Sequence, residues 1–448
     1  MSLRERLALA EEARGNGATL QVQSQAAYQE LKATMHQLIL DRIDLERLKR
    51  LTAEQFKHEL ALLVQRIIED ERIVLNQAER HHLVLDIQHE MLGFGPLERL
   101  LSDNSISDIL VNTCKQVYVE RGGRLELTDV TFTDNAHLMK IIEKIVSRVG
   151  RRVDESSPMV DARLPDGSRV NAIIPPLAVD GPILSIRRFS ANPLTIQNLI
   201  ELKSLTPPMM QVLQALGHAK INILISGGTG SGKTTLLNVL SGYIPPSERI
   251  VTIEDAAELA MRQPHVVRLE TRPPNIEGKG EVNQRALVRN ALRMRPDRII
   301  LGEVRGAEAM DMLQAMNTGH EGSLATIHSN TPRDALTRLE NMVGMSGVNL
   351  TPRAARQQIA SAITVVLQVS RLTDGARKLV SLQEVTGMEG EVISMQEIFH
   401  FEQTGVDAAG KVQGHFYATG VRPRFAERLR MFGVPVPDSV FDPDRVFE

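Results

Sequence analysis

A glycine-rich segment in the middle of the chain constrains the fold most. Residues 227–234 read Gly-Gly-Thr-Gly-Ser-Gly-Lys-Thr and complete the phosphate-binding pattern G-x-x-x-x-G-K-[ST]. The apolar run 221–225 before this segment is typical of a buried strand, and residues 235–240 after it predict the first turns of a helix. In a strand, glycine loop and helix that follow in this order, backbone N–H groups and the helix N-terminus cradle a polyphosphate. The alternative interpretation is a glycine-rich turn followed by a lysine that binds no phosphate, but such a turn would not need a strand before it and a helix after it.

The residue types of the loop predict what each one contacts. Lys233 reaches the outer phosphates of a nucleotide, and the Thr234 hydroxyl is a ligand for Mg²⁺. The chain contains neither an N-K-x-D motif, which reads guanine, nor an L-S-G-G-Q-like signature of transporter ATPases, which argues against a GTP switch and against a transporter ATPase. The residues expected to bind the nucleotide are Gly227, Gly228, Thr229, Gly230, Ser231, Gly232, Lys233, Thr234 and Thr235.

Length and composition predict a multidomain globular protein. The 448 residues suffice for two or three domains, and 42% hydrophobic with 24% charged residues is ordinary globular composition. No apolar run approaches the ~18 residues of a membrane span, the N-terminus lacks a secretory signal, and the single cysteine, Cys114, excludes an internal disulfide. We therefore expect a cytoplasmic protein without a transmembrane segment of its own, which reaches a membrane only through partner proteins.

The first half of the chain predicts three segments. Residues 1–24 are polar with little periodicity, and we expect a disordered tail. Residues 25–92 have helical periodicity, with capping-box spacing after Thr52 and Asn76, and predict an α-helical extension. Short β-type runs and one helical stretch predict a smaller N-terminal α/β domain over residues 93–190.

The second half predicts a larger α/β domain. Prolines mark a linker at residues 191–205, and strand-type runs then alternate with helical ones over residues 206–448. Alternation of this kind indicates a mainly parallel sheet covered by helices, followed here by a C-terminal subdomain. Since ligands bind at the carboxyl ends of parallel strands, chemical residues are expected there.

Two further strands of this domain end in acidic residues. Glu303 follows the run 298–301 and is expected to be the general base that polarises the attacking water. Many phosphate-loop enzymes have an aspartate where this chain has Gly302, so Thr234 must carry more of the metal contact. Glu254 is the alternative base. A surface acid at a strand end, or an acid that complements a helix dipole, is the other interpretation of both.

A fourth strand ends in His328, which we expect to donate a hydrogen bond to the γ-phosphate. Taken alone, a histidine is more often an ordinary core or surface residue. Arg285, Arg289 and Arg293 recur every four residues and share a helical face, either as a solvated or subunit-contact face or as a nucleic-acid track.

Together these segments resemble the secretion ATPases of the type II and type IV secretion superfamily. The resemblance is closer to the CpaF/TadA branch, which serves Flp-type tight-adherence (Tad) pili, and it covers roughly residues 93–383. Residues 227–234 match the family's Walker A motif, 252–259 its Asp box, 299–303 its glycine-containing Walker B motif and 319–328 its His box. Gly302 is therefore the family's own variant.

The resemblance implies a RecA-like P-loop NTPase core behind the N-terminal domain, assembled as a homo-hexamer with nucleotide held between the two domains. Such rings use ATP to drive pilin assembly through inner-membrane platform proteins, which would place the chain at the membrane surface. The resemblance also implies arginines that approach the outer phosphates. Arg169 and Arg187 are the first candidates, followed by Arg163 and Arg188. The other interpretation of these arginines is that they are exposed strand-end residues or members of ordinary ion pairs. Arg305 has the same two interpretations.

The alternative function is a RecA-like ATPase that translocates nucleic acid. Against it stand a net charge of −3 and an aromatic content of 3%, because such motors need a basic track and stacking platforms. The sequence therefore gives no strong nucleic-acid signal.

Overall fold

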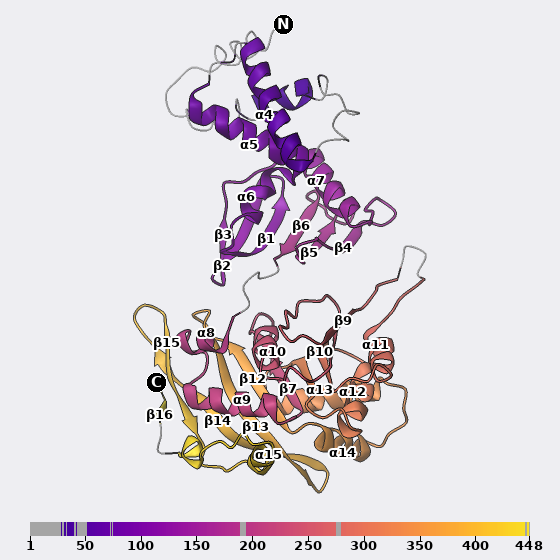
Figure 1. Ribbon diagram of the computed structural model, residues 1–448, viewed down its shortest axis with the longest axis vertical. Coiled ribbons are helices and arrows are strands. Elements are labelled where there is room, and N and C mark those ends of the chain that lie inside the picture. Colours follow the sequence, from indigo (N-terminus) through magenta and orange to yellow (C-terminus); the bar gives the residue numbers. More distant parts are fainter. Residues whose placement is uncertain are drawn as a thin grey trace. The chain divides into compact units, whose positions relative to one another are not determined.

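The computed structural model describes residues 28, 31, 32, 34–39, 42, 52–71, 73, 75–188, 194–274, 279–443, 446 and 447. The chain forms two compact units, Met1–Phe189 and Ser190–Glu448 (Figure 1). The tail predicted at residues 1–24 lies outside the described residues. Within the described ranges, no helix is both long and apolar enough to span a membrane.

The N-terminal unit begins with packed helices. α4 (Ala53–Asp70) and α5 (Gln77–Leu92) both start at a capping box, which confirms the prediction from the spacing after Thr52 and Asn76. In each box, the cap side chain accepts a hydrogen bond from the N3 backbone, and the N3 side chain accepts one from the cap N–H. The buried members of the shared core are Leu31, Met35, Ile39, Leu60, Val64, Ile67, Ile68, Leu83 and Ile87.

A largely buried carboxylate joins these helices to the rest of the unit. Glu90 on α5 lies 2.5 Å from Lys32 Nζ and 3.1 Å from Nε2 of His137, which is on α7 (Asn135–Arg148). Lys144 Nζ donates to the Glu90 backbone carbonyl at 2.9 Å. Burial opposes ionisation of Glu90, but the hydrogen bond with His137 and the charge of Lys32 outweigh it and lower its pKa to about 2. The carboxylate therefore stays charged and fixes α5 against α7.

An antiparallel sheet forms the rest of the N-terminal unit, with strand order β3-β2-β1-β6-β5-β4. Its strands are β1 (Ile106–Thr113), β2 (Gln116–Arg121), β3 (Arg124–Leu127), β4 (Met159–Arg163), β5 (Arg169–Ile173) and β6 (Ile183–Arg187). Two short elements, η1 (Gly95–Leu97) and α6 (Glu98–Leu101), lead from α5 into β1. Leu138, Ile142 and Ile145 of α7 share one core with the apolar side chains of the strands.

A mixed sheet forms the centre of the C-terminal unit, with strand order β16-β15-β14-β13-β12-β7-β11-β10-β8-β9. Its parallel part contains β7 (Ile223–Gly227), β8 (Ile250–Glu254), β9 (Val266–Glu270), β10 (Arg298–Val304), β11 (Leu324–His328) and β12 (Val365–Arg371). Its antiparallel part contains β13 (Arg377–Glu389), β14 (Val392–Val406), β15 (Val412–Ala418) and β16 (Val446–Phe447). The expectation of a mainly parallel sheet therefore holds up to residue 371 and fails beyond it.

Helices cover both faces of this sheet (Figure 1). One face carries α8 (Ile196–Glu201), α9 (Pro207–His218), α10 (Lys233–Ser241) and α15 (Phe425–Met431), with η2 (Asp438–Phe441). The other carries α11 (Gln284–Ala291), α12 (Glu308–Asn317), α13 (Pro332–Gly344) and α14 (Pro352–Ala362). Ile223 and Ile225 of β7 belong to the first core and Leu224 to the second. Burial on both faces explains the continuous apolar run of this strand.

The linker predicted at residues 191–205 is partly helical. Residues 196–201 form α8, and Ile196 and Leu199 are buried in the core of the C-terminal unit. Pro207 and Pro208 lie in the first turn of α9, where the N–H that proline lacks would have no partner within the helix. These prolines mark a helix start rather than an extended connection.

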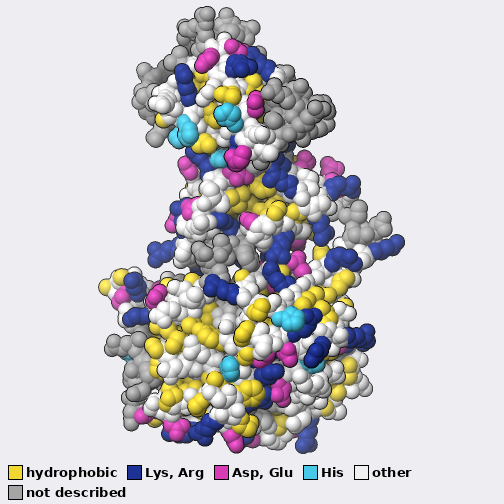
Figure 2. All heavy atoms as spheres, in the orientation of Figure 1, with side chains coloured by type: hydrophobic (Ala, Val, Ile, Leu, Met, Phe, Trp, Pro, Cys, Tyr) yellow, Lys and Arg dark blue, Asp and Glu magenta, His cyan; other side chains and the backbone are white. Residues whose placement is uncertain are grey.

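Charges of both signs are distributed over the surface. On the face shown in Figure 2, Lys and Arg side chains are interspersed with Asp and Glu side chains on both units. The described residues of this face form no continuous basic stripe, which agrees with the net charge of −3.

Candidate nucleotide-binding site

The phosphate loop connects β7 to α10, as the sequence predicts. Gly230 and Gly232 have φ angles of 67° and 99°, which favour glycine because a Cβ clashes there. Gly227 has no room for a side chain, since a Cβ would lie 2.4 Å from the Val369 carbonyl oxygen and 2.5 Å from Ser231 Oγ. Gly232 is also the N-cap of α10, so the loop leads directly into the unpaired N–H groups of a helix N-terminus.

Lys233 folds back over this loop. Its Nζ donates to the carbonyl oxygens of Gly227 and Gly228, each at 2.9 Å. Desolvation lowers the pKa of Lys233, and the negative charge of Glu303 opposes this shift. Because an ammonium bonds a charged phosphate oxygen more strongly than a neutral carbonyl, a bound polyphosphate would displace these two contacts.

Parallel strand pairing brings the other predicted residues to the same edge. In the pairing of β11 with β7, His328 lies opposite Gly227. β10 lies beside β11 and carries Glu303 near its end, and β8 lies beside β10 and ends at Glu254. The structure therefore gathers Glu254, Glu303 and His328 at the sheet edge that carries the phosphate loop.

An arginine bridges two carboxylates at this edge. Arg305 Nη2 donates to Glu303 Oε2 at 2.7 Å, and its Nη1 donates to Asp255 Oδ2 at 3.0 Å. The hydrogen bond to Glu303 raises the pKa of Arg305. The turn is fixed by Glu308, whose Oε1 accepts the N–H groups of Arg305 at 2.6 Å and Gly306 at 2.8 Å. Arg305 therefore fixes the orientation of the Glu303 carboxylate.

Glu254 is almost completely buried, with 2% of its surface exposed. Its Oε2 accepts the N–H groups of Glu258 at 2.7 Å and Leu259 at 2.9 Å, while Oε1 has no hydrogen-bond partner in the described part of the chain. Burial raises the pKa of Glu254, and the backbone hydrogen bonds oppose this shift. A buried oxygen without a protein partner suits a water molecule, including one bound to a metal ion. Together with the Thr234 hydroxyl it offers the hard oxygen donors that Mg²⁺ prefers, so the site fits this ion.

The arginines predicted in the N-terminal unit form a row. Arg163, Arg169 and Arg187 are paired across β4, β5 and β6, and directly paired residues of antiparallel strands share one face. Arg187 Nε donates to Asp108 Oδ1 on β1 at 3.0 Å. Arg188 instead donates to the backbone carbonyl groups of Asp103 and Ile106. The structure thus groups Arg163 with the two favoured arginines and separates Arg188 from them.

Two arginines that sequence reasoning missed lie against the phosphate loop. Arg371 ends β12 and Arg377 begins β13, and the two are directly paired. Arg377 Nε donates to the Gly230 carbonyl at 2.9 Å. No local motif marks either residue, since only the pairing of β12 with β7 brings them there.

The arginines at four-residue spacing belong to α11 and its C-terminal side. Arg285 Nε donates to Asp311 Oδ2 at 2.8 Å and its Nη1 to the Ser346 carbonyl at 2.9 Å. Arg289 Nε lies 3.8 Å from Asp311 Oδ1. Two of the three therefore pair with α12 of the same unit.

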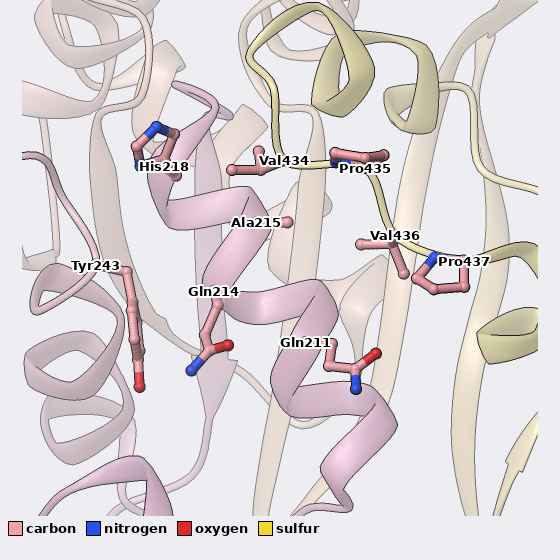
Figure 3. A pocket seen from close by; sticks show the side chains of 9 residues that line it. All are labelled: Gln211, Gln214, Ala215, His218, Tyr243, Val434, Pro435, Val436 and Pro437. Carbon is pink, nitrogen blue, oxygen red and sulfur yellow. The ribbon is translucent and has the colours of Figure 1, made fainter.

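A separate surface cavity of about 450 Å³ lies between α9 and residues 434–437 (Figure 3). Its lining residues are Gln211, Gln214, Ala215, His218, Tyr243, Val434, Pro435, Val436 and Pro437. None of them belongs to the phosphate loop or to the strand ends beside it, so the cavity is not part of the candidate site.

This strand–loop–helix unit, with carboxylates at neighbouring strand ends, defines a phosphate-loop protein of the α/β class. The chain belongs to the family described as "Type II/IV secretion system protein", whose profile matches residues 90–418. The resemblance inferred from the four motifs is thereby confirmed at the level of the family.

Several relatives take part in conjugation or secretion by name. "Putative conjugal transfer protein Rv3659c" of Mycobacterium tuberculosis is 40% identical over 312 residues, which cover 68% of this chain and 88% of the relative. Conjugal transfer protein TrbB of Rhizobium radiobacter is 31% identical, with 69% of this chain and 91% of the relative covered. Type IV secretion system protein VirB11 of Bartonella henselae is 31% identical, with 62% and 88% covered.

The chain is also similar to proteins of known structure. The crystal structure of the VirB11 ATPase from the Brucella suis type IV secretion system, in complex with sulphate, is 29% identical and covers 64% of this chain and 94% of that chain. The TM-score between the two chains is 0.36.

Proposed function

We propose that this chain hydrolyses ATP and is the motor of a pilus-assembly or secretion machine, in the CpaF/TadA branch that serves Tad/Flp-type pili. The observation that carries the proposal is the convergence of Lys233, Glu303 and His328 on one sheet edge at the phosphate loop. Membership of the type II/IV secretion family supports the motor role. The VirB11 protein of Brucella suis among the solved structures is named as an ATPase.

The residues of the site would divide the chemistry between them. Residues 227–235 bind the phosphates, and Glu303 accepts a proton from the attacking water. Mg²⁺ would be held by the Thr234 hydroxyl and, through water, by Glu254; it would supply positive charge next to the phosphates. Lys233 and His328 donate hydrogen bonds to the outer phosphates.

Glu254 is the second candidate for the base. Its raised pKa makes the carboxylate a stronger proton acceptor than an ordinary glutamate, and its Oε1 has no hydrogen-bond partner among the described residues. Glu303 has the stronger claim because its charge acts on Lys233, the residue that contacts the outer phosphates.

We further propose an assembly and a domain scheme. A helical extension over residues 25–92, an α/β domain over 93–190, a linker and a RecA-like domain over 206–448 form one subunit of a homo-hexamer. Arg169 and Arg187 would stabilise the charge that develops on the leaving γ-phosphoryl group. Inner-membrane platform proteins are the partners, and the ring would act at the cytoplasmic surface of that membrane.

A nucleic-acid motor is the alternative, favoured by the names of the conjugal transfer relatives. The interspersed charges of the visible face and the low aromatic content weigh against it.

Steady-state ATP hydrolysis and nucleotide titration test the enzyme. Lys233→Ala should lose binding, and Glu303→Gln should bind ATP while losing hydrolysis by about 100-fold or more. Glu402→Gln, which makes the same change at an exposed carboxylate of β14, is the matched control. If Glu303→Gln hydrolyses ATP at the wild-type rate and Glu254→Gln does not, then Glu254 is the base.

Two experiments test the motor. Purification of the intact protein from membranes, with and without ATP, should recover pilus platform proteins; recovery of nucleic acid alone would overturn the proposal. Mixing Lys233→Ala subunits with Arg187→Ala subunits should restore activity only if the arginine acts on a neighbouring subunit's nucleotide.

A further inference from the structure

The β12–β13 hairpin is placed beside the phosphate loop by strand pairing. β12 runs parallel to β7, with Val369 opposite Gly227, and continues to Arg371 beyond the point where β7 ends. The chain turns and returns as β13, whose first residue, Arg377, pairs with Arg371. Two guanidinium groups are therefore carried to the level at which the phosphate loop begins.

Both arginines lie against the loop glycines. Arg377 Nε donates to the Gly230 carbonyl at 2.9 Å, and a Cβ placed on Gly232 would lie 3.5 Å from Arg377 Cδ. A Cβ placed on Gly230 would lie 3.7 Å from Arg371 Nη1. The bond to Gly230 uses one of the five donors of the Arg377 guanidinium. A planar fork with further donors at this place suits a phosphate group.

The turn that carries the two arginines is braced. Asp374 Oδ1 accepts the Ala376 N–H at 2.9 Å, and Asp374 Oδ2 accepts the Val412 N–H of β15 at 3.0 Å. Leu372 N–H also donates to the Ala376 carbonyl at 2.7 Å. Since the backbone between the arginines is held, binding a ligand would order only the side chains and not the turn.

The strand order decides which part of a nucleotide the arginines meet. β12 lies on one side of β7, while β11, β10 and β8 lie on the other. Glu303, the proposed base, is on β10 and must lie near the γ-phosphate. The hairpin is therefore on the opposite side of the loop, toward phosphates that ADP and ATP have in common.

We infer that Arg371 and Arg377 form a second cationic wall of the nucleotide site and bind the diphosphate part of ADP and ATP. Arg377 also positions the loop through Gly230. This inference rests on the proposed function, because it requires a nucleoside polyphosphate in the loop.

Titration with ADP and with a non-hydrolysable ATP analogue tests the inference. Arg371→Ala and Arg377→Ala should each weaken the binding of both ligands by about tenfold and by similar factors, which is about 1.4 kcal/mol. KM for ATP should rise by a similar factor, with a smaller change in kcat. Arg353→Ala, an exposed arginine on α14, is the matched control and should bind like the wild type.

The outcomes separate the two proposals. If the wild type binds neither nucleotide, the proposed function fails; if Lys233→Ala loses binding while both hairpin variants bind like the wild type, only the inference fails. It also fails if only the ATP analogue is weakened. A purely structural role is recognised by a lower unfolding temperature of Arg377→Ala without nucleotide, combined with unchanged ADP binding in Arg371→Ala.

Discussion

Glu254 at the end of β8 occupies the space that a side chain on Gly302 of β10 would need. A Cβ added to Gly302 would lie 3.0 Å from Glu254 Cγ and 3.5 Å from Glu254 Cβ. The strands are adjacent and parallel, with Ile253 opposite Leu301 one residue earlier. The position of the glycine in the Walker B motif is therefore crowded, because the side-chain stem of Glu254 on the neighbouring strand packs against it.

Restoring the usual aspartate should therefore destabilise the protein. Gly302→Asp forces Glu254 to move and places two carboxylates side by side, and we expect a loss of about 1–3 kcal/mol in the free energy of unfolding. Chemical denaturation of Gly302→Asp, Glu254→Ala and the double variant forms a double-mutant cycle. The double variant should recover part of the loss, with a coupling energy of about 0.5–3 kcal/mol.

The control for this cycle is Gly405→Asp on β14, where nothing lies within 4 Å of an added Cβ. It should leave stability within about 0.5 kcal/mol. Additive losses in the cycle would show that Glu254 and residue 302 do not share one space.

The raised pKa of Glu254 predicts a pH-dependent contribution to stability. The folded protein holds this proton more tightly than the unfolded chain does, so neutral Glu254 contributes stability below the usual carboxyl pKa of 4.5. That contribution is lost as pH rises through the raised pKa. Glu254→Gln keeps an acceptor for the Glu258 and Leu259 N–H groups and never becomes charged.

In thermal unfolding from pH 4 to pH 8, the unfolding temperature of the wild type should therefore fall relative to that of Glu254→Gln as pH rises. Glu402→Gln, at the exposed position on β14, should follow the wild type at every pH. A constant difference between wild type and Glu254→Gln across this range would contradict a buried carboxyl that resists ionisation.

The contacts of Arg305 predict a role in positioning Glu303. Arg305→Ala removes the 2.7 Å bond to Glu303 and the 3.0 Å bond to Asp255, so the base loses its fixed orientation. We expect kcat for ATP hydrolysis to fall by about 10- to 100-fold, because misplaced reacting groups are costly. Arg305→Lys cannot bridge both carboxylates with a planar fork, so its kcat should lie between those of the wild type and Arg305→Ala.

The binding of a non-hydrolysable ATP analogue should change little in Arg305→Ala, which separates positioning from nucleotide affinity. Arg289→Ala on α11, with its longer 3.8 Å approach to Asp311, is the control. Faster hydrolysis in Arg305→Ala would mean that the arginine restrains Glu303 instead of aligning it.

Local sequence signals were sufficient wherever the structure is locally determined. Thr52 and Asn76 form the capping boxes that their spacing predicts. The strand, glycine loop and helix around Gly230 and Gly232 have the expected order, and their φ angles require the residues found there. The continuous apolar run of β7 predicts a strand buried on both faces.

Long-range pairing set the limit of sequence reasoning. Residues 377–418 form half-exposed antiparallel strands whose apolar and polar positions alternate only weakly, so they carried no strand signal comparable to β7. Arg371 and Arg377 could not be found without knowing that β12 lies beside β7. The separation of Arg188 from Arg187 likewise depends on its contacts with the Asp103 and Ile106 carbonyl groups.

A buried ion pair at the opposite end of β10 gives the last prediction. Arg298 is fully buried, and its Nε and Nη2 donate to the two carboxylate oxygens of Glu248 at 2.7 and 3.1 Å. Its Nη1 donates to the Gly217 carbonyl at 2.6 Å and that of Gly322 at 3.4 Å. Among the described residues, Arg298→Met would leave buried Glu248 with only Lys220 Nζ, 3.7 Å away, as a cationic partner.

We expect Arg298→Met to lower the free energy of unfolding by about 3–5 kcal/mol, measured by chemical denaturation. Arg356→Met, which breaks the more exposed pair with Glu340, should cost about 0–1 kcal/mol. Arg298→Met combined with Glu248→Leu should regain part of the loss, because an unpaired buried charge costs more than an apolar replacement of the pair. A loss no larger than that of Arg356→Met would show that water reaches Glu248 and that the Arg298–Glu248 pair contributes no more to stability than an exposed one.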